Sequence, residues 1–259
     1  MFIVKIGGSV LSQSEEIVKD LANYKDFIVV HGSGPQVDKL TKERLGKEPR
    51  WVYSVSGVKC RYTDSEVILL HQEVCRKQTS KLVELLKTNG MDAIGFAESP
   101  IIFAKRKEAI KVIENEKKYI LREDQSGKIE RIDSEGLNSV LSKGKIPVIP
   151  PLAIGHNGEP LNVNGDRVCA YLARELGVDT IINLSNIPGF LRNEKIVPEI
   201  KLNELEQLRK ETRGGMSIKL IGVQEAMNFG VQKFVISSGE IDKPVTSALD
   251  GKGTVFLHG

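Results

Sequence analysis

The sequence contains few of the residues from which disulfide frameworks and metal sites are built. It has three cysteines, Cys60, Cys75 and Cys169, which lie far apart and form no CxxC pair. Its four histidines show no metal-ligand spacing. An odd number of scattered cysteines argues against a disulfide framework and against a structural zinc site. We therefore expect reduced thiols and no metal site built from protein ligands.

The chain also lacks long apolar runs and a strong net charge. No run approaches the roughly 18 apolar residues that a membrane span requires. Residues 1–10 are apolar but have no basic segment or cleavage site of a signal peptide, so we interpret them as a first strand. The net charge of +3 is too small to indicate nucleic acid binding. We expect a soluble, cytoplasmic protein that binds neither membranes nor nucleic acid.

Short apolar runs bounded by glycine or proline alternate with segments of helical spacing. Buried strands are predicted at 2–6, 27–31, 91–97, 146–154, 178–184, 231–237 and 253–257. One helix is predicted after Ser14, its candidate N-cap, and a long one between Asp64 and Gly90. Strands that alternate with helices indicate an α/β fold, a three-layer sandwich with a mainly parallel central sheet.

Residues 101–132 interrupt this alternation. They read as hairpin strands joined by polar turns, which predicts an antiparallel insertion on the edge of the sheet. Within it, residues 105–118 carry an excess of lysine and arginine. Such a run is either a solvated face or a surface that attracts an acidic partner. Since no repeat, low-complexity tract or linker divides the chain, we expect one domain.

Glycine-rich turns follow the first two predicted strands. Lys5 to Ser9 reads KIGGS, and His31 to Pro35 reads HGSGP and opens a helix. Glycine lets the backbone approach an anionic ligand closely, although each turn alone could be only a tight connection. Neither turn matches GxGxxG or the P-loop pattern. Because ligands of parallel sheets bind at the carboxyl ends of strands, the two turns together predict a binding site there.

Two later motifs carry polar groups at the start of predicted helices. In Asn162 to Asp166, two amides and a carboxylate at alternate positions could face one cleft, or could form a polar turn with a helix cap. In Arg213 to Lys219, the lysine lies one turn inside a helix that glycines begin. That position suits contact with phosphate, although a solvated helical lysine is the alternative.

Taken in order, these motifs resemble the amino acid kinase family, and the resemblance extends over the whole chain. The motifs are KIGGS (5–9), HGSGP (31–35), GVKCRYTD (57–64), NVNGD (162–166), NLSNIPGF (183–190) and GGMSIK (214–219). The chain looks most like the acetylglutamate kinase branch, and like its relatives that phosphorylate glutamate or 2-aminoadipate on an amino-group carrier protein. The resemblance implies a single domain of residues 1–259 with about eight strands. In it, an N-lobe (about 1–160) binds the carboxylate substrate and a C-lobe (about 161–259) binds ATP.

The resemblance also implies roles for individual residues. Lys5 and Lys219 would stabilise the transferring phosphoryl group, and Asp166 would orient both lysines. The implied carboxylate-binding residues are Ser33, Gly34, Arg61 and Asn162, with Arg61 on the α-carboxylate. The implied phosphate and ATP-binding residues are Gly7, Gly8, Ser185, Gly189, Gly214 and Gly215, and the stretch Asn183–Gly189 is implied to line the nucleotide site. The family further implies ATP with Mg²⁺ and a homodimer.

Two residues depart from the family pattern. Ser33 stands where acetylglutamate kinases usually have glycine, which leaves the acyl group of the substrate open. Asn186 stands where many members have aspartate in the nucleotide stretch.

The implied chemistry is physically consistent with these residues. A carboxylate with a reference pKa of about 4.3 is ionised at neutral pH, so its attack on phosphorus requires no general base. Lysines, backbone N–H groups and Mg²⁺ would offset its repulsion from the triphosphate. We therefore predict an ATP-dependent kinase of lysine or arginine biosynthesis that makes an acyl phosphate from a substrate on an acidic carrier protein. The alternatives are a kinase of free N-acetyl-L-glutamate and a non-catalytic amino-acid-sensing module.

Overall fold

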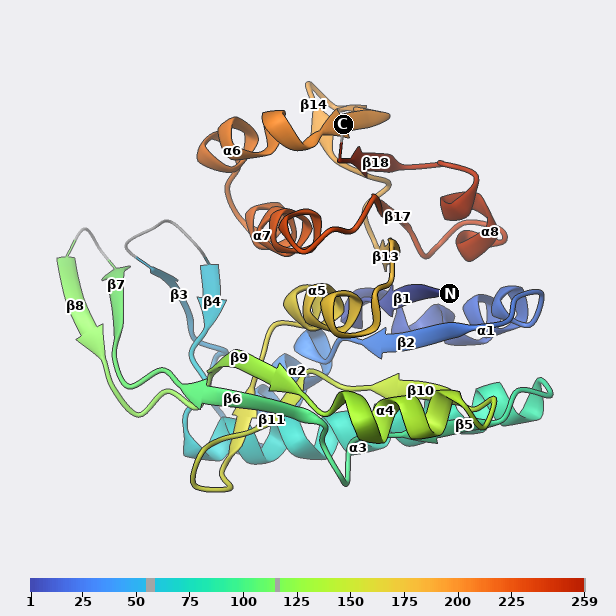
Figure 1. Cartoon of the computed structure of the whole chain (residues 1–259). Helices are drawn as coiled ribbons and strands as arrows, with labels where there is room; N and C mark the ends of the chain where they lie inside the picture. Colours follow the sequence, from blue (N-terminus) through green and yellow to red (C-terminus); the bar gives the residue numbers. More distant parts are fainter. Residues whose placement is uncertain (55–58, 115–116, 259) are drawn as a thin grey trace.

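An eight-stranded sheet runs through the middle of the protein (Figure 1). The computed structural model describes residues 1–54, 59–114 and 117–258. Across the sheet, the strands follow the order β16 (Glu199–Lys201), β18 (Thr254–Leu257), β17 (Lys233–Ser238), β13 (Thr180–Ser185), β1 (Phe2–Ile6), β2 (Phe27–His31), β10 (Ile146–Ile149) and β5 (Ala93–Gly95). All neighbours are parallel except β17 and β18. The prediction of a mainly parallel α/β sheet is confirmed.

Helices cover both faces of this sheet, which explains why β1 and β2 are buried along their whole length. Phe2, Val4 and Ile6 pack with α1 (Ser14–Leu21), α3 (Ser65–Thr88) and α8 (Pro244–Leu249). Ile3 packs on the other face with α4 (Ser134–Leu141), α5 (Gly165–Leu176), α6 (Leu202–Glu211) and α7 (Gly215–Asn228). Side chains alternate along a strand, so Lys5 points to the same side as Ile3, toward α5 and α7.

The predicted antiparallel insertion is present, but the prediction that it lies on the edge of the central sheet is wrong. Its strands join two separate four-stranded sheets. One has the order β12 (Pro160–Asn162), β11 (Leu152–Ile154), β6 (Ile102–Arg106) and β9 (Gly127–Ile132). The other, called the outer sheet below, has the order β4 (Lys59–Arg61), β3 (Trp51–Ser54), β7 (Ile110–Glu114) and β8 (Lys117–Leu121), and it projects from one side of the molecule (Figure 1). Its members come from distant segments, and such pairing leaves no local pattern in the sequence.

Two local predictions need correction. The strand predicted at 146–154 is two strands in different sheets, β10 and β11, because prolines at 150 and 151 lack the N–H groups that would continue a ladder. Ser14 is not the N-cap of α1. A 3₁₀ helix, η1 (Gly8–Gln13), runs directly into α1, so Gln13 occupies the cap position and Ser14 is the buried first residue of the helix.

The long helix was predicted correctly at both ends. Asp64 is the N-cap of α3, and its carboxylate accepts hydrogen bonds from the backbone N–H groups of Glu66 and Val67. Gly90 follows the helix with φ of 79°, the left-handed conformation that ends many helices. Among the helices of the described ranges, none has the length and apolar character needed to cross a membrane.

Candidate active site

A cavity of about 900 Å³ opens at the carboxyl ends of β1, β2 and β13. Its walls are the turns after these strands, the first turns of α5 and α7, and β3, β4 and β7 of the outer sheet. The predicted site residues that line it are Lys5, Gly7, Gly8, Ser33, Gly34, Arg61, Asn162, Asp166, Ser185, Gly215 and Lys219. The fold therefore brings together residues from both halves of the chain.

Four helices begin at this cavity. Gly8, Gly34, Gly165 and Gly215 line it and are the first residues of η1, α2 (Gly34–Leu45), α5 and α7. The first N–H groups of a helix have no acceptor within the helix, and its N-terminus carries partial positive charge. In α5, the N–H groups of Asp166 and Arg167 donate to Asn164 Oδ1, so the termini of η1, α2 and α7 are the ones suited to an anion with several phosphate groups.

Three residues that line the cavity, Lys5, Asp166 and Lys219, form a hydrogen-bonded chain with the fully buried Asn183. Lys5 Nζ donates to Asp166 Oδ1 at 2.6 Å, and Asn183 Nδ2 donates to the same oxygen at 2.5 Å. Lys219 Nζ donates to Asn183 Oδ1 at 3.2 Å. Asp166 thus holds Lys5 directly and Lys219 through Asn183. Lys5 and Asn183 are register partners on β1 and β13, which explains their proximity.

Asn183 was not among the predicted catalytic residues. It opens the motif NLSNIPGF, so the sequence contained a signal for it, but only as part of the nucleotide stretch. Its place between Asp166 and Lys219 depends on the packing of β13 against β1 and of α7 over the sheet.

Burial and mutual charge shift the pKa values of these groups. Burial lowers the pKa of Lys219 to about 8, and the charge of Lys5 acts in the same direction. Burial alone would raise the pKa of Asp166, but the charges of Lys5 and Lys219 and the hydrogen bonds from Lys5 and Asn183 lower it below its usual value. Asp166 is therefore a stable anion between two cations.

Arg61, which also lines the cavity, is held in a fixed position. Its guanidinium donates to the carboxylate of Asp38 and to the Gly34 carbonyl at 3.0 Å. It also lies over the Trp51 ring, with Cζ 4.7 Å from the ring centroid. Asn162 is oriented by its Nδ2, which donates to Thr63 Oγ1 at 3.0 Å.

The two glycine turns pack directly on each other. A Cβ atom on Gly32 would lie 2.5 Å from the backbone nitrogen of Gly8, so this approach requires glycine. The Gly7 N–H donates to the Leu184 carbonyl at 2.8 Å, and this bond occupies it. Of Gly7 and Gly8, Gly8 lies in the first turn of η1, so its N–H has no acceptor within that helix.

Two predicted residues, Gly189 and Gly214, do not line the cavity. Gly189 packs against Thr254, whose Oγ1 would lie 2.7 Å from a Cβ atom at this position. Gly214 is the N-cap of α7, and its carbonyl accepts from Ser217 Oγ at 2.7 Å. Ser185 does line the cavity, and its buried Oγ has no hydrogen-bond partner within the described residues.

The cavity offers no set of protein ligands for a metal ion. Asp166 is the one carboxylate among the described residues that line it, and Lys5 and Asn183 occupy its Oδ1. In the part of the chain that the structure describes, no cluster of three or more metal-ligating side chains occurs. These residues fit Mg²⁺ only as an ion carried by phosphate oxygens and water, which is its usual mode at nucleotides.

Comparison with known proteins agrees with this geometry. The family model described as the amino acid kinase family matches residues 1–238. Over the full length of both chains, the protein is 36% identical to the "Putative LysW-aminoadipate/LysW-glutamate kinase" of Nitrosopumilus maritimus (strain SCM1). It is 37% identical, again over both full lengths, to the "LysW-aminoadipate/LysW-glutamate kinase" of Saccharolobus islandicus (strain Y.N.15.51 / Yellowstone #2). N-acetylglutamate synthase from Neisseria gonorrhoeae shares the fold, with a TM-score of 0.84 at 18% identity, and the match covers all of this chain and 59% of that one.

The family match and the kinase-named full-length relatives identify the protein as an ATP-dependent kinase. The match of the family model to most of the chain shows that the protein belongs to the amino acid kinase family.

Proposed function

We propose that the protein transfers the γ-phosphoryl group of ATP to the side-chain carboxylate of glutamate or 2-aminoadipate held on an amino-group carrier protein, in lysine or arginine biosynthesis. The observation that carries this proposal is the single cavity that joins the Lys5–Asp166–Asn183–Lys219 chain to the fixed Arg61 guanidinium. The two lysines suit a transferring phosphoryl group, and the Arg61 guanidinium suits a carboxylate. The printed names of the full-length relatives support the substrate class.

In this reaction, a carboxylate oxygen forms a bond to the γ-phosphorus while the bond from that phosphorus to the β,γ-bridging oxygen breaks. ADP leaves, and an acyl phosphate remains. Lys5 and Lys219 lie where negative charge develops on the phosphoryl oxygens, and Asp166 keeps both ammonium groups in place. Mg²⁺ bound to the ATP phosphates would supply further charge neutralisation.

We assign the carboxylate to an N-lobe of about residues 1–160 and ATP to a C-lobe of about residues 161–259. Ser33, Gly34 and Arg61 would bind the substrate, together with Asn162 at the boundary. Gly8, Ser185 and Gly215 would contact ATP. Gly7, Gly189 and Gly214 would act by shaping the backbone around it, because none of them presents a free group to the cavity in the contacts described above.

The outer sheet supports the proposal of an acidic partner. On adjacent strands, Trp51 lies opposite Arg61, and Tyr53 lies opposite both Lys59 and Ile113. Ile113 also lies opposite Lys118, and Lys111 lies opposite Ile120. Directly opposed residues share a face. This face, called the basic face below, therefore comprises Trp51, Tyr53, Lys59, Arg61, Lys111, Ile113, Lys118 and Ile120.

No acidic residue occurs on the basic face within the described strand positions. The other face packs internally through Val52, Val112 and their neighbours. Trp51, Lys59, Arg61 and Lys111 also line the cavity, so the basic face is continuous with the proposed substrate site. The predicted basic run 105–118, of which residues 115–116 lie outside the described residues, does not form one surface, because strand alternation places only part of it here.

Reversing charge on the basic face is expected to slow the reaction of a carrier-linked substrate selectively. We expect Lys111→Glu/Lys118→Glu to lower kcat/KM for an acidic carrier protein bearing glutamate by about tenfold at low salt, because electrostatic attraction raises association rates. The difference should shrink at physiological ionic strength, where the Debye length is about 8 Å. Initial rates over a salt series measure this effect.

The matched control is Lys105→Glu/Lys128→Glu. It reverses the charge of two lysines that lie opposite each other on β6 and β9, outside the outer sheet. It should leave kcat/KM near the wild-type value at every salt concentration. Because Lys111 lines the cavity, the comparison with free N-acetyl-L-glutamate uses Lys118→Glu alone, which should leave activity on this small substrate near the wild-type value, as should the control variant. If kcat/KM for both substrates were equally insensitive to charge reversal and to salt, a kinase of free N-acetyl-L-glutamate would become the better assignment.

Arg61→Lys is expected to weaken carboxylate binding although the charge is kept. A guanidinium grips a carboxylate through two parallel hydrogen bonds and also stacks on Trp51, whereas an ammonium is a point charge. We expect KM for the carboxylate substrate to rise tenfold or more with little change in KM for ATP. Trp51 is the one tryptophan of the chain, so its fluorescence reports substrate binding directly. Wild-type kinetics in this variant would remove Arg61 from the site.

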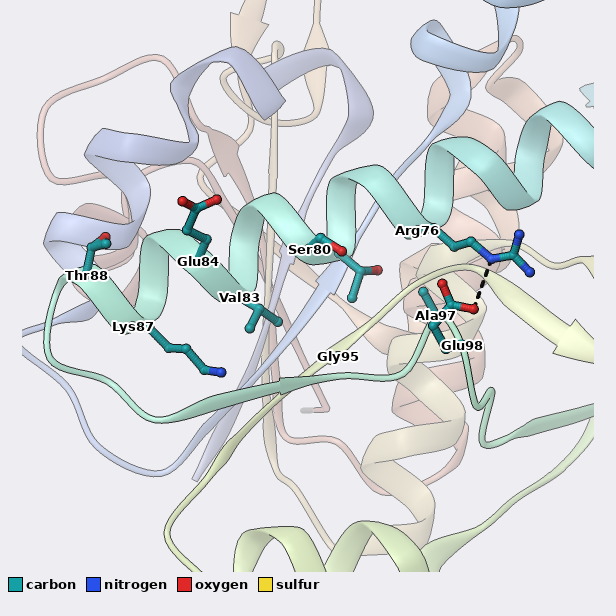
Figure 2. A pocket seen from close by; sticks show the side chains of 10 residues that line it. Arg76, Ser80, Val83, Glu84, Lys87, Thr88, Gly95, Ala97 and Glu98 are labelled. Atoms are coloured by element: carbon teal, nitrogen blue, oxygen red, sulfur yellow. Dashed lines mark ion pairs between the residues drawn. The ribbon is translucent and has the colours of Figure 1, made fainter.

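We also propose that the protein is a homodimer whose central sheets meet at β5. In the described part of the chain, β5 is an edge of the eight-stranded sheet, and its Ile94 is 37% exposed. Beside it, a groove of about 390 Å³ lies between α3 and residues 95–98, with Val83 and Ala97 among its walls (Figure 2). An uncovered sheet edge with apolar side chains favours pairing with another chain.

The mass in solution, measured by light scattering, tests this proposal. We expect a dimer for the wild type and a monomer for Ile94→Lys. A monomeric wild type would contradict it.

A further inference from the structure

A buried serine–histidine pair lies in the wall of the cavity, next to the Arg61 site. Ser33 is the N-cap residue of α2, and His71 belongs to α3. They are 5% and 2% exposed, and both line the cavity. Ser33 Oγ and His71 Nδ1 are 3.3 Å apart. The phosphoryl-transfer steps described above do not use His71.

The contacts of His71 define which ring nitrogen carries the proton. Nε2 lies 3.0 Å from the Pro151 carbonyl oxygen, which accepts hydrogen bonds and donates none. Burial lowers the pKa of His71 to about 4, so the ring is neutral at physiological pH and has one N–H. That hydrogen must be on Nε2, because the other tautomer would aim a lone pair at a carbonyl oxygen. Nδ1 is therefore a bare acceptor.

The tautomer of His71 determines whether Ser33 donates or accepts the hydrogen bond between them. Since Nδ1 has no hydrogen, the Ser33 hydroxyl donates to it, and Oγ can only accept from a ligand. The neighbouring Cys75 thiol, 3.6 Å from His71 Nε2, also contacts Ser33. Serine at an N-cap normally accepts from backbone N–H groups of the first helical turn, but Ser33 makes no such bond. The hydroxyl is turned away from the helix and toward His71.

We propose that His71 fixes Ser33 as an obligate hydrogen-bond acceptor, and that this acceptor recognises the amide N–H of a substrate whose α-nitrogen is acylated. The proposal rests on the function proposed above and assigns the residues that recognise the acylated nitrogen of its substrate. The Gly34 carbonyl, one residue after Ser33, holds Arg61. An α-carboxylate on Arg61 would place the α-nitrogen, two bonds from the carboxyl carbon, beside Ser33. His71 is thus a positioning residue, and Ser33 is the specificity-determining one.

The first test measures the tautomer directly and requires neither substrate nor turnover. His31 is the internal reference, because its Nδ1 lies 3.0 Å from the Gly32 carbonyl oxygen while Nε2 lies 2.8 Å from Thr79 Oγ1. Its pKa is also lowered to about 4 by burial, and its contacts require the opposite tautomer. Nitrogen NMR of the histidine-labelled protein at neutral pH should show His71 protonated on Nε2 and His31 on Nδ1. A proton on Nδ1 of His71 would overturn the proposal.

The second test compares an amide ligand with its ester. Calorimetry would measure binding of N-acetyl-L-glutamate and of the (S)-2-acetoxyglutarate ester, in which oxygen replaces the N–H. We expect the wild type to favour the amide by about fivefold or more, which is the effect of one neutral hydrogen bond. His71→Phe and Ser33→Ala should each lose this preference. His71→Gln, whose amide oxygen can accept from Ser33, should recover part of it.

The outcomes separate this inference from the proposed function. Equal preference for the amide in the wild type and in both disabling variants would overturn the inference, whether or not the enzyme phosphorylates carrier-linked substrate. Failure of the wild type to bind either ligand would overturn it as well. A His71-dependent preference without any phosphoryl transfer would contradict the proposed function alone.

Discussion

Replacing Lys219 with alanine is expected to lower kcat about a hundredfold or more while KM for each substrate changes only a few-fold. Lys219 is half-buried, donates a hydrogen bond to Asn183 and shares the cavity with Lys5. Its charge acts mainly on oxygens that become more negative in the transition state. Loss of such a contact typically costs about 3 kcal/mol in the barrier. Steady-state kinetics with varied ATP and carboxylate substrate measure both constants.

Lys5→Ala is the companion variant, and the double variant shows whether the lysines act together. Because both belong to one hydrogen-bonded chain, the two losses should not add. A variant of Lys219 with normal kcat and only a raised KM would contradict its assignment to the transition state.

The pH dependence provides a second measure of the same group. With a pKa of about 8 in the free enzyme, Lys219 loses its proton as the pH rises through this value, so kcat/KM should fall on the alkaline side. The charge of Asp166 raises the pKa of Lys219, so Asp166→Asn should move the alkaline limb to lower pH. Lys219→Arg should move the alkaline limb out of the measured pH range, because an arginine side chain stays protonated there. A flat wild-type profile up to pH 10 would show that protonated Lys219 is not required.

Gly222→Ala is expected to impair both stability and catalysis, although Gly222 lies in none of the motifs. Gly222 is buried on α7, three residues after Lys219, where this helix crosses α5. A Cβ atom there would lie 2.6 Å from Cβ of Asp166 and 3.1 Å from its carbonyl carbon. Either α7 moves away or Asp166 shifts, and each separates the two lysines. Overpacking of this kind costs about 1–3 kcal/mol of unfolding free energy.

The expected result is a lower melting temperature together with a kcat at least tenfold below the wild-type value. Thermal unfolding and initial rates measure the two effects. Gly215→Ala is the matched control for stability, because it begins the same helix and a Cβ atom there meets nothing within 4 Å. It should not lower the melting temperature, since alanine favours helix more than glycine does. If Gly222→Ala were stable and fully active, the spacing of α5 and α7 would not control the site.

Local patterns were sufficient to predict the strands and the glycine turns around the site. Runs such as FIVKI and FIVVH are apolar throughout because helices cover both faces of the sheet, and this leaves a clear signal. The turns after β1 and β2 contain glycine because one turn packs on the other. Asp64 and Gly90 marked the ends of α3 because helix caps are local chemistry.

Features that depend on contacts between distant segments were missed or misplaced. The insertion was assigned to the wrong sheet, because alternating apolar residues show that a strand pairs but not with which partner. Gly189 and Gly214 match the motifs, yet they face Thr254 and the start of α7 and do not line the cavity. No sequence pattern marked Gly222 as important for the site, since a single glycine within a helical pattern indicates only a weak helix former.

The sequence by itself determined the class of fold and the strand ends at which the glycine turns would gather, because period, capping and turn chemistry act over a few residues. The roles proposed for Lys5, Asp166 and Lys219 came from the resemblance of its motifs to the family. Only the tertiary structure decided how those groups meet. Lys5 and Asp166 are 161 residues apart along the chain, and Asn183 links them to Lys219 because β1 pairs with β13 while α7 packs on α5. Such distances of a few ångströms follow from the packing of whole elements, which no local pattern encodes.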